Sequence, residues 1–286
     1  MITVLTTRRR LVQAFAGLGM DARGRAEPAF DRYSFWVFGL LNPSRLEISG
    51  VAPSRLHLNS TSTEWILESG RIQAIDTRMA PVRVAGPDGG PVSFVLEVPG
   101  VLRRSFYGTL KISSDGRSLI PVVTMQREIA VSSVVGAELP LARTGDQALM
   151  AQAVITRSFL AGIASPRHRN AFFCDTTHCQ FLRCPALPAT RPARAVAETS
   201  GVVIWANDSV APVSYSAACG GLTNGGYRDG YCYRSVPCRI CRERGLTRRG
   251  HGWGLCQEGA IGLAQRGCKW RGIIDEYFPN AGLRQL

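Results

Sequence analysis

Lysine is nearly absent from this chain of 286 residues, although the chain is strongly basic. Lys111 and Lys269 are the only lysines among 34 basic residues, so arginine carries almost all of the net charge of +13. An arginine-rich surface favours anionic partners such as nucleic acid, acidic lipid or the polyanions of a bacterial wall. The arginines are spread along the chain and are not interleaved with aromatic residues, so we expect no specific nucleic-acid partner.

Long hydrophobic runs are also lacking. No stretch approaches the roughly 18 apolar residues of a transmembrane helix, so we expect no membrane-spanning segment. Within residues 1–30, three arginines precede a short apolar stretch, which is the order found in a secretory signal. Gln13 and several small residues weaken that stretch, and no clean cleavage site follows. Residues 1–30 are therefore predicted to be an N-terminal segment with a weak signal sequence.

Cysteine is missing from the first 173 residues, and all nine cysteines follow. This asymmetry predicts that disulfides, metal or both hold the later part of the chain, while the earlier part folds without them. An odd number of cysteines cannot pair completely within one chain. At least one thiol is therefore free, metal-bound or paired with another chain.

Residues 31–130 contain short apolar runs that alternate with Gly, Pro, Asn and Asp turns, which is typical of an antiparallel sandwich or barrel. His, Cys and acidic residues do not concentrate there, so we expect a binding or packing module. The predicted strands are Tyr33–Leu40, Arg45–Ile48, Leu56–Leu58, Trp65–Leu67, Gly70–Ile75, Val82–Val84, Val92–Val98 and Ser105–Ile112.

Glu138 is the one carboxylate in the otherwise apolar or small stretch 132–140. Pro140 disfavours helical geometry at Leu139, so Glu138 is predicted to lie at a strand-to-helix corner. Its apolar neighbours are expected to favour its protonated form. Glu138 could equally be a simple capping residue.

A helix is predicted over residues 145–164, directly after this acid. Thr144 and Gln147 have the spacing of a capping box that would open the helix. A rigid helix behind a loop acid would hold a proton donor in place.

Further elements are predicted in the second half. Apolar periodicity indicates helices at Gln257–Gln265 and Trp270–Tyr277. A hairpin is predicted between Val202–Ala206 and Val213–Ser216, around the turn Asn207-Asp208.

His168, Cys174 and Cys179 form the first candidate metal site. Two thiolates and one imidazole suit zinc, and three protein ligands would leave a fourth position for water or substrate. Their spacing alone favours a disulfide plus a surface histidine. His178 could replace His168 as the imidazole ligand, and Cys184 is a further possible ligand.

Cys238 and Cys241, with Cys232 nearby, form a second group of thiols. Two cysteines separated by two residues can be half of a structural zinc site, a redox pair or part of a disulfide set. No strand-helix context supports redox chemistry, so we expect a structural disulfide or zinc. Cys219 could pair with Cys232, or act as a nucleophile beside His251.

The segment 250–257 has glycines at alternate positions, which let the backbone approach a ligand closely. His251 and Gln257 can hydrogen-bond sugar hydroxyls or N-acetyl groups, and the ring of Trp253 offers a face for stacking on a sugar. Gly252 lies between the histidine and the tryptophan. The glycines also fit a turn that merely packs against the helix predicted at 145–164.

Four separated blocks together resemble the stage II sporulation protein D family, which includes the LytB-type amidase enhancers. The resemblance runs from about Tyr107 to the end of the chain. Its blocks are Ala137-Glu-Leu-Pro140 with Asp146–Arg157, Cys174–Gln180, Tyr215–Gly221 and Gly250–Gln257.

Two departures from the family pattern lie at the end of the last block. The family usually has Ser at the position of Cys256 and an aromatic residue at the position of Glu258. The first puts in doubt any role that needs a hydroxyl at 256, and the second makes Glu258 a conceivable second carboxylate.

The resemblance implies an α+β fold. The strand pattern adds an antiparallel β module over residues 31–100, outside the resemblance, which would precede a mixed domain over 101–286 with a few helices and a cysteine-rich loop region. The resemblance also implies zinc held by one histidine and two cysteines near 168–179.

The resemblance implies cleavage of peptidoglycan glycan strands by a lytic transglycosylase outside the cytoplasm, with Glu138 as the single general acid and base. One acid suffices for this chemistry, whereas a glycoside hydrolase needs a pair. The alternative is a non-catalytic wall-binding protein that stimulates an N-acetylmuramoyl-L-alanine amidase. The residues implied to bind substrate are Arg157, His251, Gly252, Trp253 and Gln257.

Overall fold

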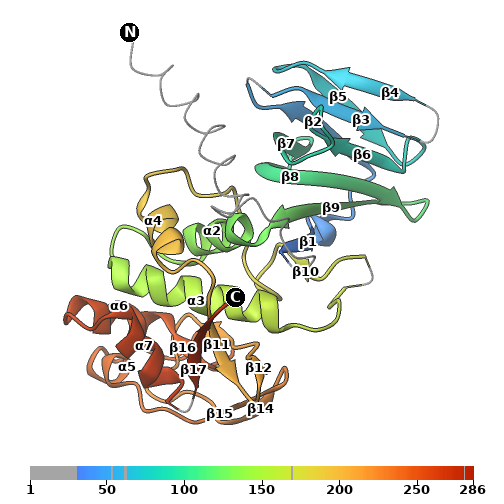
Figure 1. Ribbon diagram of the computed structural model, residues 1–286. Coiled ribbons are helices and arrows are strands. Elements are labelled where there is room, and N and C mark those ends of the chain that lie inside the picture. The colour runs from blue at the N-terminus through green and yellow to red at the C-terminus, as the bar shows by residue number, and fades with distance from the viewer. Residues whose placement is uncertain (1–30, 53, 61–62, 169, 280) are drawn as a thin grey trace. The chain divides into compact units, whose positions relative to one another are not determined.

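The computed structural model describes residues 31–52, 54–60, 63–168, 170–279 and 281–286. The N-terminal segment 1–30, with its signal-like pattern, lies outside the described residues. The chain forms two compact units (Figure 1). The β unit comprises the described residues up to Ser133 together with Ser165–Pro185, and the helical unit comprises Val134–Ala164 and Ala186–Leu286. The domain boundary expected between residues 100 and 101 stays a prediction.

The β unit contains every strand predicted between residues 31 and 112, with small shifts at the ends. The first predicted strand stops at Trp36, and a 3-10 turn follows at Gly39–Leu41. The strands are β1 (Arg32–Trp36), β2 (Arg45–Gly50), β3 (Leu56–Asn59), β4 (Glu64–Leu67), β5 (Ile72–Asp76), β6 (Val82–Ala85), β7 (Val92–Val98), β8 (Leu102–Ser114), β9 (Leu119–Gln126) and β10 (Phe173–Cys174).

The long strand β8 takes part in two sheets. Its first half, Leu102–Gly108, pairs with β7, which continues through β2 to β5. Its second half lies between β9 and β6 in the sheet of order β10-β1-β9-β8-β6-β3-β4. Gly108 lies where the two halves meet, and a Cβ there would be 2.3 Å from the carbonyl oxygen of Thr124. Only glycine permits this close approach of the two backbones.

The core of the β unit is built from alternate strand residues, and the phenylalanines among them are at most 1% exposed. The rings of Phe94 and Phe106 have centroids 5.7 Å apart, and those of Phe35 and Phe173 are 5.6 Å apart. The short strand β10 lies parallel to β1, with Trp36 opposite Cys174. This pairing brings the cysteine to the end of the first strand.

Residues Arg127–Glu138 form helix α2, so the predicted strand-to-helix corner at Glu138 is wrong. The β-branched residues of this segment suggested a strand. They are buried around a helix instead, where Ser133 donates to the carbonyl of Ile129 at 2.8 Å. Tertiary burial outweighs the local β propensity here. The helix ends at Glu138 because Pro140 disfavours helical geometry at the residue before it.

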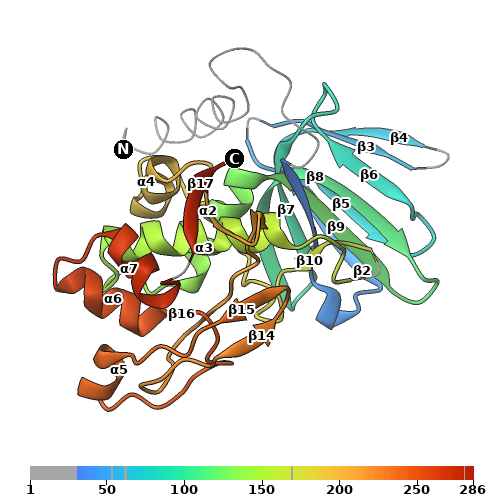
Figure 2. The same ribbon diagram turned by 60° about the horizontal axis from the view of Figure 1, so that its bottom comes forward.

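The helical unit is built around α3, whose residues Ala148–Leu160 are all buried. α3 lies between α4 on one side and α6 and α7 on the other (Figures 1 and 2). The elements are α3 (Asp146–Gly162), α4 (Arg191–Glu198), β11 (Val202–Ala206), β12 (Ser209–Val210), β13 (Tyr215–Ser216), β14 (Gly226–Arg228), β15 (Tyr231–Tyr233), α5 (Arg239–Glu243), β16 (Leu255–Cys256), α6 (Gln257–Gln265), α7 (Trp270–Tyr277) and β17 (Gly282–Gln285).

The three predicted helices of this unit are confirmed, but the predicted capping box is wrong. Gly145 is the N-cap of α3 and no side chain caps the helix. Thr144 donates its hydroxyl to the carbonyl of Pro140 at 2.9 Å. The side chain of Gln147 accepts from the backbone of Trp270 at 2.9 Å, so it ties α3 to α7.

The predicted turn Asn207-Asp208 is present, with φ angles of 51° and 57°. Two consecutive residues with positive φ make a tight hairpin, so the return strand begins at once as β12. The prediction that Val213–Ser216 forms that return strand is therefore wrong. Its last two residues form β13, which pairs in parallel with β16.

The α+β class is confirmed, with an antiparallel module, a few helices and cysteine-rich loops. Among the described residues, no helix combines the length and the apolar character needed to cross a membrane.

Candidate functional site

Glu138 is the last residue of α2 and is half-buried. The hydroxyl of Tyr215 is buried beside it. Burial, and then the charge of Glu138, raise the pKa of Tyr215 well above its ordinary value. The phenol is therefore protonated and able to donate a hydrogen bond. Sequence reasoning missed this residue, although it begins the block 215–221.

The pairing of β13 with β16 joins Tyr215 to the segment 250–257. Tyr215 lies opposite Leu255 in this parallel pair. A second bridge, between Ala218 and Arg249, holds the start of the same segment. The neighbour of Glu138 and the segment 250–257 thus belong to one local structure within the helical unit.

The alternating glycines of this segment are required by its backbone. Gly250, Gly252 and Gly254 have φ angles of 87°, 76° and 71°. A Cβ at Gly254 would lie 1.9 Å from the carbonyl oxygen of Ser214. Left-handed geometry and close backbone contact together explain why small residues alternate here.

His251 points a hydrogen-bond donor away from the backbone. Its Nδ1 accepts from the backbone N–H of Trp253 at 3.0 Å, so the neutral ring carries its proton on Nε2. Partial desolvation, and then the charge of Arg228, lower the pKa of His251 to about 4. The residue is exposed and neutral near pH 7, so its Nε2–H can donate to an oxygen of a ligand.

Trp253 and Gln257 differ in what they can reach. Trp253 is half-buried, and its ring meets the ring of Tyr233 edge-on, with centroids 5.4 Å apart. Gln257 is buried and donates to the side chain of Gln152 in α3 at 3.3 Å. Gln257 therefore joins α6 to α3 and faces the interior.

Arg157 is fully buried in α3. Its guanidinium donates to the carbonyls of Val202 at 3.0 Å and Val196 at 3.4 Å. These contacts fix α4 and β11 against α3. Because the side chain has no exposed surface, it could reach a ligand only if those elements moved.

Glu258, the conceivable second carboxylate, is held by arginines. Arg143 contacts both of its oxygens at 2.7 and 2.5 Å, and Arg249 donates to it at 2.9 Å. The hydrogen bonds from Arg143 are the main reason that the pKa of Glu258 is lowered. A carboxylate held in its charged form is a poor proton donor, so Glu138 remains the better candidate acid.

In the β unit, the structure brings together a four-residue group that could hold a metal ion. We call it the His/Cys cluster, and its members are His168, Cys174, His178 and Cys179. One ligand atom from each residue lies within 4.8 Å of the others. The group includes both histidines that the sequence had offered as alternatives.

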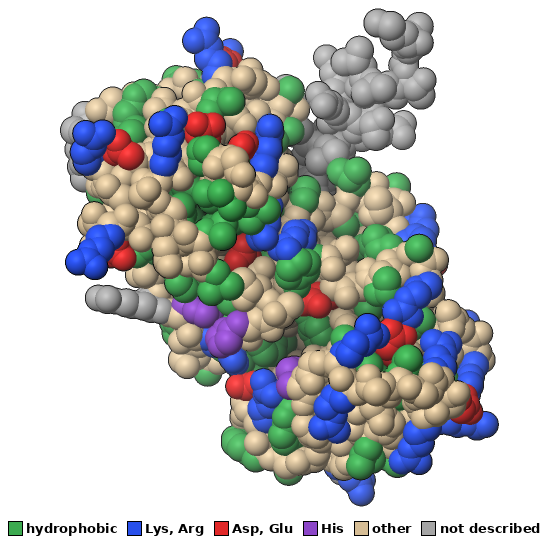
Figure 3. All heavy atoms as spheres, turned by 180° about the vertical axis from the view of Figure 1, so that it is seen from behind, with side chains coloured by type: hydrophobic (Ala, Val, Ile, Leu, Met, Phe, Trp, Pro, Cys, Tyr) green, Lys and Arg blue, Asp and Glu red, His purple; other side chains and the backbone are tan. Residues whose placement is uncertain are grey.

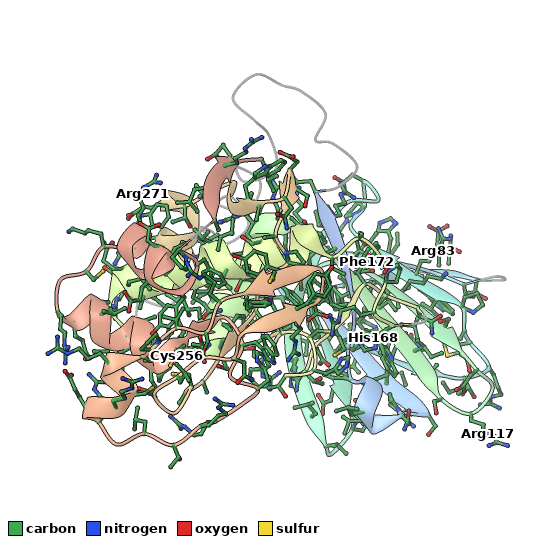
Figure 4. All side chains as sticks on the ribbon, turned by 90° about the horizontal axis from the view of Figure 1, so that it is seen from below. Arg83, Arg117, His168, Phe172, Cys256 and Arg271 are labelled. Carbon is green, nitrogen blue, oxygen red and sulfur yellow. The ribbon has the colours of Figure 1, made fainter. Side chains whose placement is uncertain are left out.

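The loop of the His/Cys cluster is held in place by its surroundings. Cys174 belongs to β10, and the ring of His168 (Figure 4) packs 5.7 Å from that of Trp36. Asp175 accepts a hydrogen bond from the backbone of Phe38 at 3.3 Å and forms an ion pair with Arg104. These contacts fix the ligand atoms before any ion binds.

The ligand atoms already contact one another. The distance from His168 Nε2 to Cys179 Sγ is 3.3 Å, and that from His178 Nδ1 to Cys179 Sγ is 3.5 Å. A hydrogen bond from the Cys179 thiol is the main cause that lowers the pKa of Cys174 to about 3. The same bond raises the pKa of Cys179 far above its usual range.

Two imidazoles and two thiols suit tetrahedral zinc. Four protein ligands would fill the coordination shell, so the predicted open fourth position gives way to a closed set, which is typical of structural sites. Cys184 is exposed and is not part of the cluster. A pocket of about 520 Å³ opens beside the cluster, lined in part by Trp36, Leu40 and His178.

All nine cysteines lie in the described part of the chain, and each is a free thiol in the structure. The suggested disulfide between Cys219 and Cys232 is therefore wrong, since Cys232 is exposed and Cys219 is buried among other thiols. A hydrogen bond to Cys238 is the main cause that raises the pKa of Cys219 to about 12. A buried thiol in this state is a poor nucleophile.

On the face shown in Figure 3, Lys and Arg side chains lie at separate points, and several lie beside acidic side chains. This face does not carry the continuous basic stripe that follows a nucleic-acid backbone.

Comparison with known families gives a match to the family model described as "Stage II sporulation protein", over residues 115–205. The matched region contains Glu138, helix α3 and all of the His/Cys cluster. It ends before Tyr215 and before the segment 250–257. A search of curated proteins found no match to the chain.

Proposed function

We propose that the protein, whose residues 115–205 match the stage II sporulation protein family model, cleaves peptidoglycan glycan strands as a lytic transglycosylase. The family match indicates a role related to the cell wall, and strand cleavage is our more specific proposal. Because peptidoglycan lies outside the cytoplasmic membrane, the proposal includes export of the protein. The observation that carries it is the setting of Glu138, a half-buried acid beside a protonated tyrosine.

The position of Glu138 supports both halves of an acid–base cycle. Glu138 ends α2 and is half-buried, so part of its side chain is open to a substrate. The hydroxyl of Tyr215 can donate to the carboxylate once the proton has left. In this cycle Glu138 protonates the glycosidic oxygen and then takes a proton from the sugar's own C6 hydroxyl, which forms the 1,6-anhydro ring.

The segment 250–257 would orient the sugar. The Nε2–H of His251 would donate to an N-acetyl or hydroxyl oxygen, and the backbone at Gly252 lets a ligand approach closely. Trp253 would stack on a sugar ring. Gln257 would act indirectly, since it ties α6 to α3.

We propose that the His/Cys cluster binds zinc. The donor set fits this ion, and it would fix the loop 165–185 in the β unit without supplying a water for the reaction. Cell-wall glycan strands, and a wall amidase in the alternative role, are the partners that we propose.

The direct test uses purified full-length protein and glycan strands freed of peptides. The products are analysed by mass spectrometry for 1,6-anhydro-muramic ends. We expect such ends with the wild type and a loss of about 10²- to 10⁴-fold in rate for Glu138→Gln, since that is what a positioned general acid and base contributes.

Glu198→Gln is the matched control, because Glu198 is also the last residue of a helix but is exposed. It should keep the wild-type rate. Turnover retained by Glu138→Gln would contradict the mechanism. Strand binding with no anhydro ends from the wild type would instead assign the protein as a non-catalytic stimulator of an amidase.

A further inference from the structure

A second group of cysteines converges in the helical unit, outside the region that matches the family model. We call it the four-cysteine cluster, and its members are Cys219, Cys238, Cys241 and Cys256. They come from three separate segments: the turn after β13, the start of α5 and the junction of β16 with α6. Figure 4 shows Cys256 within this unit. All four side chains are at most 2% exposed.

The sulfur atoms have the spacing of a single tetrahedral ion. All four lie within 4.8 Å of one another, and those of Cys241 and Cys256 are 3.5 Å apart. Four sulfurs about 2.3 Å from a central zinc ion would be about 3.8 Å from one another. A cluster of several iron and sulfide ions would hold its four thiolates farther apart, because those ions would lie between them.

The surroundings supply hydrogen-bond donors to the sulfurs. Cys256 is the N-cap of α6, where its sulfur accepts from the backbone of Gly259 at 3.4 Å. It also accepts from the backbone of Cys219 at 3.3 Å. The hydroxyl of Tyr277 lies 3.4 Å from the sulfur of Cys238. Donors of this kind around the ligand sulfurs are typical of built metal sites.

Glycine is required at two points around the cluster. A Cβ at Gly259 would lie 1.8 Å from the hydroxyl oxygen of Tyr277 and 2.9 Å from the sulfur of Cys238. Gly221, two residues after Cys219, has a φ angle of 101°, which turns the chain sharply. The local backbone is thus shaped around the four sulfurs.

We propose that the four-cysteine cluster binds one zinc ion as a closed structural site. Four thiolates leave no position for water or substrate, so the ion has no part in the reaction. It would tie α5, α6 and the turn after β13 together. Because Cys256 belongs to the segment 250–257, the ion would also hold that segment in place. Binding would release the protons that the four cysteines still carry, because the thiolate is the ligand form.

The first test is the zinc content of the full-length protein, purified under reducing conditions without added metal. Cys241→Ser should lose one equivalent of zinc per chain relative to the wild type. Cys232→Ser is the matched control, because Cys232 is an exposed cysteine of the same unit. It should lose none. The measured quantity is the difference in zinc content between wild type and variant, which does not depend on whether the His/Cys cluster also holds zinc.

An unchanged zinc content in Cys241→Ser would overturn the proposal. So would one equivalent of iron in place of zinc, or a disulfide between two members of the cluster found by thiol mapping of the native protein.

A second test does not depend on the folding of a cysteine variant. Zinc X-ray absorption is measured on the double variant His168→Ala/His178→Ala, which removes both imidazole ligands of the His/Cys cluster and changes no residue of the helical unit. We expect four sulfur neighbours at about 2.3 Å around the remaining zinc. A shell dominated by nitrogen or oxygen, or no bound zinc, would contradict the proposal.

Discussion

The two metal-binding candidates use similar ligands in different settings. The His/Cys cluster lies at an edge of the β unit, beside a pocket, and two of its ligands come from histidines. The four-cysteine cluster lies in the interior of the helical unit, and three segments without long strands meet there. The β unit has a large sheet that can fold around its own core. The helical unit has only short strands, so a central ion would matter more to it.

Removal of metal should show this difference most strongly. Structural zinc contributes on the order of 10 kcal/mol of apparent binding free energy in small domains, which is comparable with the whole stability of a domain. We expect chelation to remove hydrogen-exchange protection across residues 219–265, but in the β unit only within 165–185. Restoring zinc should restore both regions. Equal loss in the two units would show that the β unit also depends on its cluster for folding.

Each cluster also has a buried acid next to it, and the two acids should differ in importance. Asp175 pairs with Arg104, whose side chain is only 15% exposed, whereas Glu258 pairs with Arg143, which is 46% exposed. Removing one partner of a buried pair costs about 3 kcal/mol or more, while half-exposed arginines can be hydrated instead. We expect Asp175→Asn to lower the free energy of unfolding by about 3 kcal/mol and Glu258→Gln by about 1 kcal/mol.

Denaturant unfolding of the zinc-loaded protein would measure both changes. Glu243→Gln provides a control, because Glu243 forms ion pairs near the surface with Arg239 and Arg266. Its effect should stay within about 0.5 kcal/mol. The reverse order for Asp175→Asn and Glu258→Gln would mean that the acid beside the four-cysteine cluster is the more important tie.

Local pattern was enough to predict most of the regular elements. The turn residues between short apolar runs gave the strands of the β unit, and apolar periodicity gave α3, α6 and α7. The local pattern failed at α2. Its β-branched residues suggested a strand, but these residues are buried around a helix, and the sequence alone does not show that burial. Tyr215 interacts with Glu138 although the two are far apart in sequence, and no local signal marks this proximity.

The metal candidates show the same limit. Close spacing in sequence placed Cys174 and Cys179 in one cluster, and Cys238 and Cys241 in the other. Cys219 and Cys256 join the second cluster only through the fold. Cys232, which is nearer in sequence, does not. Spacing shows which cysteines can share a turn, but not which distant segments meet.

The histidines of the two units also differ in their surroundings, and here we expect the smallest change in a measured property. His168 and His178 lie among thiols, whereas the ring of His251 accepts a hydrogen bond from a backbone N–H. The pKa of His251 is lowered from 6.5 to about 4, so its ring stays neutral between pH 8 and pH 5. Because the unfolded state takes up the proton first, the free energy of unfolding falls as the pH drops below about 6.5, and this loss ends below about pH 4. We expect an NMR titration midpoint near 4 for His251 that does not move when zinc is added, and sugar binding that changes little from pH 8 to pH 5.

The variant His251→Ala identifies the NMR signal of this ring. A midpoint near 6.5 would show that the ring is fully hydrated, and a midpoint that moves with zinc would show that it contacts a metal site.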